Sequence, residues 1–163
     1  MRIDIAKGFF HLIMDSGYSP SIAEQSCVIS PLSDEAARSL LLPTSEEAYI
    51  IKRLFLGDGI PAFLVMECIP LRFLSDPLEA DNLPESVFQI AADHCRERIE
   101  YSNMTIGTVK DIDDIGRAMR LPEAKTLLRL KETHYTKANK PLIFSDIYVN
   151  DDIIHFQVRR KIG

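Results

Sequence analysis

The chain has 163 residues, a formal net charge of −5, 46% hydrophobic residues and 26% charged residues. These values are typical of one globular domain, which we expect to span residues 1–163 and to bury a substantial core. The negative charge argues against this segment binding nucleic acid itself, because a surface that follows phosphates needs clustered Lys and Arg.

Hydropathy and cysteine usage indicate where the protein works. No apolar run reaches the roughly 18 residues of a membrane span. The apolar stretch 8–14 is too short for a signal peptide and is flanked by aspartates. Cys27, Cys68 and Cys95 are odd in number and far apart, so we expect free, buried thiols rather than a disulfide framework. These features predict a cytoplasmic protein with no membrane segment.

Helices and strands are predicted in a mixed order along the chain. Helical periodicity with capping residues such as Ser33 predicts helices near residues 4–16, 33–41, 84–96 and 111–119. Apolar runs bounded by turn residues predict strands near residues 24–29, 49–56, 60–70, 99–109, 126–136, 141–149 and 153–158.

The stretch 49–70 is the strongest hairpin signal, because Gly57-Asp58-Gly59 joins two apolar, strand-forming runs. Each arm carries one unexpected charge, Arg53 on the first and Glu67 on the second. Pairing outward from the turn places Arg53 nearest to Phe63. The face that carries Arg53 is either a solvated side of the sheet with a snorkelling arginine or the wall of a polar pocket.

Two segments of the chain repeat the same order of elements. Residues 28–69 and 109–149 each run from a strand through a short helix and a Leu-Pro pair into a hairpin. The spacing from Ala37-Arg38 to Leu42-Pro43 equals that from Gly116-Arg117 to Leu121-Pro122. We therefore predict an α+β fold with a mostly antiparallel, pseudo-symmetric sheet flanked by helices. A cleft between such halves is a natural place for a site.

A search for catalytic or metal-binding motifs gives nothing positive. The sequence has no glycine-rich phosphate loop, no paired-cysteine zinc spacing and no nucleophile elbow. His11, His94, His134 and His155 are dispersed. We therefore expect no metal, no cofactor and no enzyme activity. Charges on apolar strands remain as the chemical signal, and they are how a sheet makes a small-molecule pocket.

The same stretch carries a resemblance to a known family. Arg53, the turn Leu56-Gly57-Asp58-Gly59-Ile60-Pro61, Glu67 and Ile69-Pro70 resemble the UTRA (UbiC transcription regulator-associated) domain. This is the effector-binding domain of the HutC-like branch of GntR-family bacterial transcription regulators, and it has the chorismate-lyase-like fold. The resemblance covers roughly residues 4–156, through matches such as Pro31-Leu32-Ser33 and Lys140-Pro141.

The resemblance implies ligand-binding residues. Family members that bind sugar phosphates use an arginine and an acid at the positions of Arg53 and Glu67, and a serine at the position of Ser86. Tyr148 matches an aromatic residue near the end of the second hairpin, and Ser21 matches a serine in an early loop. Two alternatives stay open: Ser86 as a helix-start hydrogen-bond acceptor and Tyr148 as a core aromatic.

Two phenylalanines depart from the family pattern. Phe55 stands where sugar-phosphate-binding members often have a second arginine, and Phe88 stands where they often have a tyrosine. We expect both rings to line the cleft. Losing a basic residue and a hydroxyl favours a singly charged anion, or a ligand with an apolar part, over a dianion.

Two classes of function follow. The favoured one is the small-molecule effector-binding domain of a homodimeric regulator, with a sugar acid, sugar phosphate or amino acid as effector. DNA would be bound only through a winged-helix domain that this chain lacks. The alternative is a chorismate-lyase-like enzyme on the same fold. Arg53 with Glu67 would hold a dicarboxylate poorly, because the acid repels it.

Overall fold

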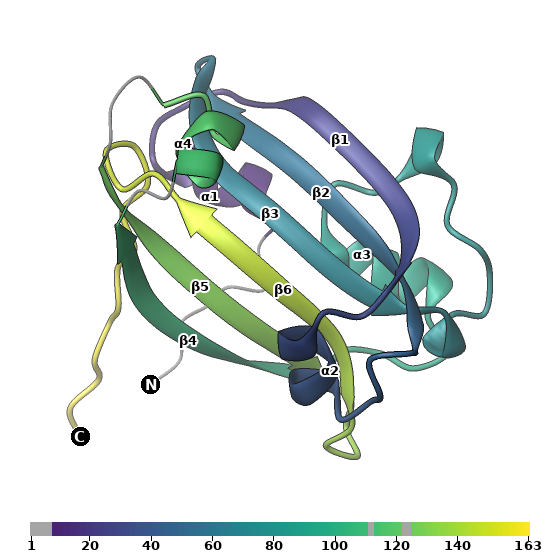
Figure 1. The fold of residues 1–163 in the computed structure, drawn as a ribbon. Coiled ribbons are helices and arrows are strands. Elements are labelled where there is room, and N and C mark those ends of the chain that lie inside the picture. Colours follow the sequence, from purple (N-terminus) through teal and green to yellow (C-terminus); the bar gives the residue numbers. More distant parts are fainter. Residues whose placement is uncertain (1–7, 111–112, 122–124) are drawn as a thin grey trace.

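The fold is one antiparallel sheet with helices on both sides (Figure 1). The computed structural model describes residues 8–110, 113–121 and 125–163. The strands lie in the order β1-β2-β3-β6-β5-β4, and every hydrogen-bonded pair is antiparallel. Their bounds are β1 (Pro20–Pro31), β2 (Glu47–Gly57), β3 (Ile60–Pro70), β4 (Tyr101–Lys110), β5 (Thr126–Tyr135) and β6 (Pro141–Val149). The predicted α+β class is confirmed.

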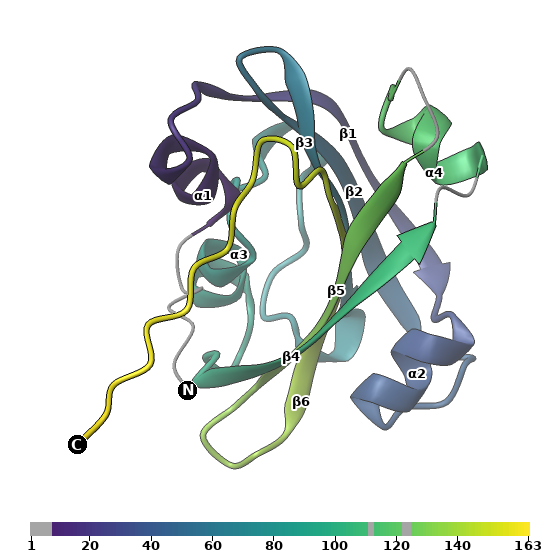
Figure 2. The ribbon, with the colours of Figure 1, turned by 90° about the vertical axis from the view of Figure 1, so that its left-hand side faces the viewer.

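In the described part of the chain, four α-helices cover the two faces of the sheet, α1 and α3 on one and α2 and α4 on the other (Figure 2). They are α1 (Phe9–Asp15), α2 (Asp34–Leu40), α3 (Val87–His94) and α4 (Asp113–Ala118), with 3-10 turns η1 (Leu71–Phe73) and η2 (Ala80–Asn82). We name the faces by their helices, the α1/α3 face and the α2/α4 face. All four lie within predicted helical ranges, although residues 4–7 and 111–112 fall outside the described part of the chain. No described helix has the length and hydropathy to cross a membrane.

The β2–β3 hairpin turns on two residues with positive φ, Asp58 at 49° and Gly59 at 77°. That combination suits the tight turn that matches the twist of paired strands. Arg53 pairs with Val65 and not with the predicted Phe63. One residue of this shift arises because the turn is centred between Asp58 and Gly59, and the other from an irregularity between Phe55 and Leu56. A β-bulge of this kind is not visible in the sequence pattern.

The predicted internal repeat is present in the backbone. β1-α2-β2-β3 and β4-α4-β5-β6 place their strands in mirrored order, with β3 and β6 paired at the centre. Both helices end on a left-handed residue, Leu41 or Arg120. The next amide then donates back into the helix, from Leu42 to the carbonyl of Ala37 and from Leu121 to that of Gly116, at 3.0 Å in each case.

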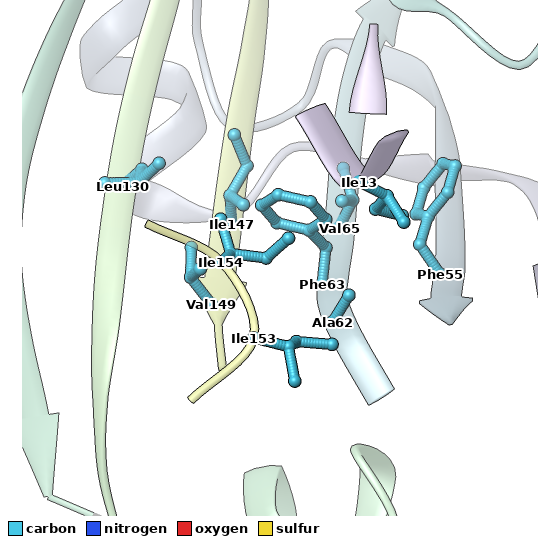
Figure 3. Packing of buried hydrophobic residues seen from close by; sticks show 10 residues of the cluster. All are labelled: Ile13, Phe55, Ala62, Phe63, Val65, Leu130, Ile147, Val149, Ile153 and Ile154. Atoms are coloured by element: carbon cyan, nitrogen blue, oxygen red, sulfur yellow. The ribbon is translucent and has the colours of Figure 1, made fainter. Parts of the chain in front are cut away.

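The hydrophobic core is divided between the two faces. On the α1/α3 face, Figure 3 shows Ile13 of α1 over Phe55, Phe63 and Val65, with Ile153 and Ile154 closing the other side. A second cluster on that face joins α3 to the sheet. On the α2/α4 face, smaller clusters gather around α2 and around Met119, which follows α4.

Two predicted strand boundaries are wrong. Residues 153–158 form no strand, because Ile153 and Ile154 sit in a turn after β6 and use their side chains to cap the core. β1 begins at Pro20, four residues before the predicted start, and ends at Pro31, two residues after the predicted end. It is longer than predicted because the long strand β2 pairs with it over its whole length. The three cysteines are free, but only Cys68 is buried.

Candidate functional site

A row of polar side chains crosses the middle of the α1/α3 face. Glu67 of β3 stands directly opposite Ser145 of β6, which in turn stands opposite Glu132 of β5. Side chains at directly paired positions point to the same face of an antiparallel sheet. Three neighbouring strands therefore present two carboxylates and a hydroxyl side by side, in a face that is otherwise apolar.

A small cavity, partly open to solvent, lies over this row. Its polar wall is formed by the row itself together with His134 of β5 and Ser86 at the start of α3. The remaining lining residues are mostly apolar and come from α1, α3, the strands and the C-terminal segment: Gly8, Phe9, Leu12, Phe63, Val87, Phe88, Met104, Leu130, Ile147 and Phe156. A mostly apolar cavity with few converging polar groups is the usual form of a small-molecule site.

Glu67 is the most unusual group in the cavity wall. Its side chain is 1% exposed, and neither carboxylate oxygen has a hydrogen-bond partner among the described residues. Burial raises the pKa of Glu67 to about 7, although the positive charge of Arg53 acts in the opposite direction. An ionised carboxylate without donors is costly in such a place. A ligand that donates hydrogen bonds would remove that cost.

Arg53 lies on the same face, diagonal to Glu67 across the β2–β3 pair. It is 1% exposed, so the alternative of a solvated strand face is excluded. Its Nη1 donates to the carbonyl oxygen of Pro84 at 2.7 Å, while Nε and Nη2 have no partner among the described residues. Arg53 is not among the residues that line the cavity. It lies on β2, beside the lining residues of β3, and its charge acts on Glu67.

The β5 side of the cavity is a connected network. Ser102 Oγ lies 2.7 Å from His134 Nδ1, and His134 Nε2 lies 3.2 Å from Ser145 Oγ. Burial lowers the pKa of His134 to about 3, so the imidazole is neutral. Burial also raises the pKa of Glu132 to about 7, against a hydrogen bond from Ser102 that lowers it. The ring of Phe88 meets that of His134 edge-on, with centroids 5.4 Å apart.

The structure brings three of the sequence-predicted residues together in this cavity: Glu67, Ser86 and Phe88. Ser86 also accepts a hydrogen bond from the amide of Phe88 at 3.2 Å, so the helix-start alternative is correct as well. A residue at an N-cap satisfies one of the free amides of the helix. Its hydroxyl therefore both caps α3 and borders the cavity.

Three other predicted residues do not converge on the cavity. Tyr148 pairs with Leu64 and Arg129 on the α2/α4 face, where its ring packs beside Leu54 and Leu127. The core-aromatic alternative fits this position, because Tyr148 is one residue out of phase with Ser145 and Ile147 along β6. Phe55 is not in the lining either.

Helix α1 covers the ring of Phe55. It lies 5.1 Å from the ring of Phe9 and 5.9 Å from that of Phe10, inside the core cluster. Ser21 is exposed on β1 opposite Leu56. The early loop that was expected to hold Ser21 is part of the edge strand, so its side chain has no route to the cavity wall.

Glu132, His134 and Ser145 escaped the sequence interpretation. The signal was present, because Leu130, Glu132 and His134 share one face of a period-2 strand, as Ile51 and Arg53 do. The search for histidines near other histidines did not detect it. Among residues 8–110, 113–121 and 125–163, no group of three or more His, Cys, Asp or Glu side chains is arranged to hold a metal ion.

Comparison with solved structures shows the same fold in other bacterial proteins, two of them described as regulators or parts of regulators. A gene product of Staphylococcus aureus subsp. aureus N315 superposes with a TM-score of 0.76 at 20% identity, covering 99% of this chain and 100% of that one. The ligand-binding domain of a regulator assigned to the GntR family from Bordetella bronchiseptica gives 0.74 at 16% identity, covering 88% and 90%. A GntR-family regulator from Bacillus cereus gives 0.73 at 18% identity, covering 88% and 98%.

Sequence comparison gives the family. No curated protein shows significant similarity to the chain. The family model of the UTRA domain, however, matches residues 15–155, which include all six strands and the cavity wall from Phe63 to Ile147. The chain belongs to the UTRA domain family.

Proposed function

We propose that this chain is the effector-binding domain of a GntR-family transcriptional regulator and that the effector occupies the cavity on the α1/α3 face. The observation that carries this proposal is Glu67, a buried carboxylate in the cavity wall with two unpartnered oxygens. A bound effector that donates to Glu67 would favour one conformation of the domain, and this preference would change the DNA affinity of an attached or partner winged-helix domain.

The effector we propose is a small polar molecule of the sugar acid, sugar phosphate or amino acid kind. Glu67 would accept from its hydroxyl or amine groups, and Ser86 and Phe88 would border it. The unpartnered Nε and Nη2 of Arg53 are donors for an anionic end, provided that the side chain turns toward the cavity. Arg53→Ala should then weaken effector binding by about 1.5–3 kcal/mol, the scale of a charged hydrogen bond.

We propose that the domain works as a homodimer in the cytoplasm and has no catalytic activity. Regulators that bind two-fold operators are themselves two-fold dimers. A lyase acting on a dicarboxylate is disfavoured by the charge of the wall, which contains two carboxylates and, among the described residues, no Lys or Arg. Sedimentation should give a dimer at micromolar concentration, and an assay of chorismate turnover should give no product.

The binding test is a thermal-shift screen of sugar acids, sugar phosphates and amino acids, followed by calorimetry on the hits. Glu67→Gln keeps the size of the side chain and removes its charge, so we expect it to weaken binding at least about tenfold. Tyr148→Phe, on the α2/α4 face, is the matched control and should leave the affinity unchanged. Equal affinities for wild type and Glu67→Gln would refute the site.

A further inference from the structure

We propose that the cavity on the α1/α3 face selects an ammonium group: its effector is a cation, or carries a primary amine, on a partly apolar body, and the amine lies between Glu67 and Glu132. This inference rests on the proposed function and narrows it to the amine-bearing members of the candidate classes. The residues of β5 that carry it have no counterpart among the residues implied by the family resemblance.

The charges that face the cavity are mainly negative. Glu67 comes from β3 and Glu132 from β5, and Ser145 stands between them in the register. A third carboxylate, Glu85, precedes Ser86 but is not a lining residue; its buried Oε2 has no partner among the described residues. The only described cation that acts on Glu67 is Arg53, and it is not among the residues that line the cavity.

An anionic group placed against Glu67 and Glu132 would be repelled, so any anionic end of the effector would lie on the Arg53 side. A neutral alcohol would gain less from these carboxylates than an amine does. Two unpartnered oxygens on Glu67 can accept two hydrogen bonds, and donors that carry a positive charge make the stronger ones. An ammonium ion has three donors, which matches one bond to Glu67, one to Glu132 and one to the Ser145 hydroxyl. His134 adds no positive charge, because burial lowers the pKa of its imidazole to about 3, although its Nδ1 lies 3.5 Å from Glu132 Oε1.

The other lining residues suit the body of such a ligand by their chemistry. Phe9, Phe63, Phe88 and Phe156 contribute aromatic rings to the lining, and Leu12, Met104, Leu130 and Ile147 contribute aliphatic surface. Aromatic faces attract cations as well as apolar groups. A flat or aliphatic group with one amine therefore matches both parts of the wall.

Amine binding should also displace protons from the two carboxyls. Both Glu67 and Glu132 have a pKa of about 7 in the empty cavity, so each is partly protonated at neutral pH. A bound cation favours the ionised form. Amine affinity should therefore fall as the pH drops from 8 to 6, and binding at pH 7 should release protons into the buffer.

The test uses three probes with the same ring: benzylamine as the cation, benzyl alcohol as the neutral form and benzoate as the anion. Amide chemical shifts of β3, β5 and β6 are followed during titration of the whole chain. We expect benzylamine to bind about tenfold or more tightly than benzyl alcohol, and benzoate to be weakest, as expected when a charged hydrogen bond is gained or replaced by repulsion.

Variants assign the effect to the two carboxylates. Glu67→Gln should lower the affinity for benzylamine at least about tenfold, and Glu132→Gln should lower it about threefold. The affinity for benzyl alcohol should change less than about twofold in either variant. Tyr148→Phe should change neither. The pH dependence of benzylamine binding to the wild type gives a second readout, which does not depend on the folding of any variant.

The outcomes separate this inference from the proposed function. One outcome is that benzoate or benzyl alcohol changes the amide chemical shifts of cavity residues at concentrations equal to or below those needed for benzylamine. In that case the cavity binds ligands but the proposed preference for amines is wrong. If none of the three probes shifts residues of the cavity wall, both the cavity as binding site and its preference are refuted. A benzylamine affinity that does not change between pH 6 and 8 also refutes the role of the carboxyls.

Discussion

The two faces of the sheet treat charged side chains in opposite ways. On the α2/α4 face, Arg129 makes two hydrogen bonds to Asp146, at 2.9 and 2.7 Å, and a third at 3.4 Å to Glu35 of α2. Lys131 pairs with Glu35 as well. On the α1/α3 face, Glu67 has no hydrogen-bond partner and Arg53 uses one nitrogen of three among the described residues.

The difference separates a structural role from a binding role. The paired charges of the α2/α4 face are complete in the folded chain and tie α2 to β5 and β6. The charges of the α1/α3 face are more deeply buried and incomplete, which lowers stability until something else supplies partners. Incomplete buried charges beside a cavity are therefore the reason why we propose the ligand site on this side of the sheet.

The largest effect on stability is expected from breaking the ion pairs of the α2/α4 face. Replacing Arg129 by Met removes both bonds to Asp146 and leaves that carboxylate uncompensated, so the free energy of unfolding at pH 7 should fall by about 2–3 kcal/mol. Urea denaturation measures this. Arg117→Ala, which breaks an exposed pair with Asp114, is the control and should cost less than about 0.5 kcal/mol. Similar losses in the two variants would show that the Arg129 cluster is only a surface pair.

On the α1/α3 face, removing a charge should raise the free energy of unfolding instead of lowering it. Burial raises the pKa of Glu67 to about 7, above its ordinary value, so the folded protein holds a proton that the unfolded chain has lost between pH 4.5 and 7. Stability from this group therefore declines as the pH rises through that window. Glu67→Gln should stabilise the ligand-free protein by about 1–2 kcal/mol at pH 8 and have little effect at pH 4.5. Destabilisation at pH 8 would mean that Glu67 has a partner.

His134 should give a smaller effect on the acid side. Its pKa is lowered to about 3, so the unfolded chain takes up a proton below about pH 6.5 and the folded protein does not. Stability from His134 is thus present above pH 6.5 and is lost as the pH falls toward 3. His134→Gln should flatten the loss between pH 6.5 and 5.5 by about 1 kcal/mol. An unchanged slope would contradict the neutral, buried imidazole.

The smallest effect is expected at Tyr148. The guanidinium of Arg129 lies 5.2 Å from its ring centroid, and a phenylalanine would keep that contact. Tyr148→Phe should change the free energy of unfolding by less than about 0.5 kcal/mol and leave ligand affinity as it is. Loss of binding in this variant would place part of the site on the α2/α4 face.

Sequence reasoning found the fold because its signals are local or repeated. The turn at Asp58-Gly59, the cap at Ser33 and the doubled Leu-Pro pattern each depend on a few adjacent residues. The prediction of a final strand was wrong, because Ile153 and Ile154 pack their side chains into the core and their backbone pairs with no strand.

The site was only half accessible from the sequence. Glu67 stood out as a charge on an apolar strand, and the same reasoning applies to Glu132. Which strands are neighbours, however, is decided by the β3–β6 and β5–β6 pairing, and no local pattern encodes that register. The same register decides on which face of the sheet Tyr148 lies. Motifs shared with a family do not reveal this register, so the resemblance could not predict the face of Tyr148.

The most direct test of the incomplete charge is the ionisation of Glu67 itself. Carbon-detected NMR of the side-chain carboxyl, assigned with Glu67→Gln, follows its titration in the ligand-free chain and again with saturating benzylamine. We expect a midpoint near pH 7 without ligand and a clearly lower midpoint with it. A ligand-free midpoint near pH 4.5, unchanged by the amine, would show that Glu67 is already satisfied and would contradict the account.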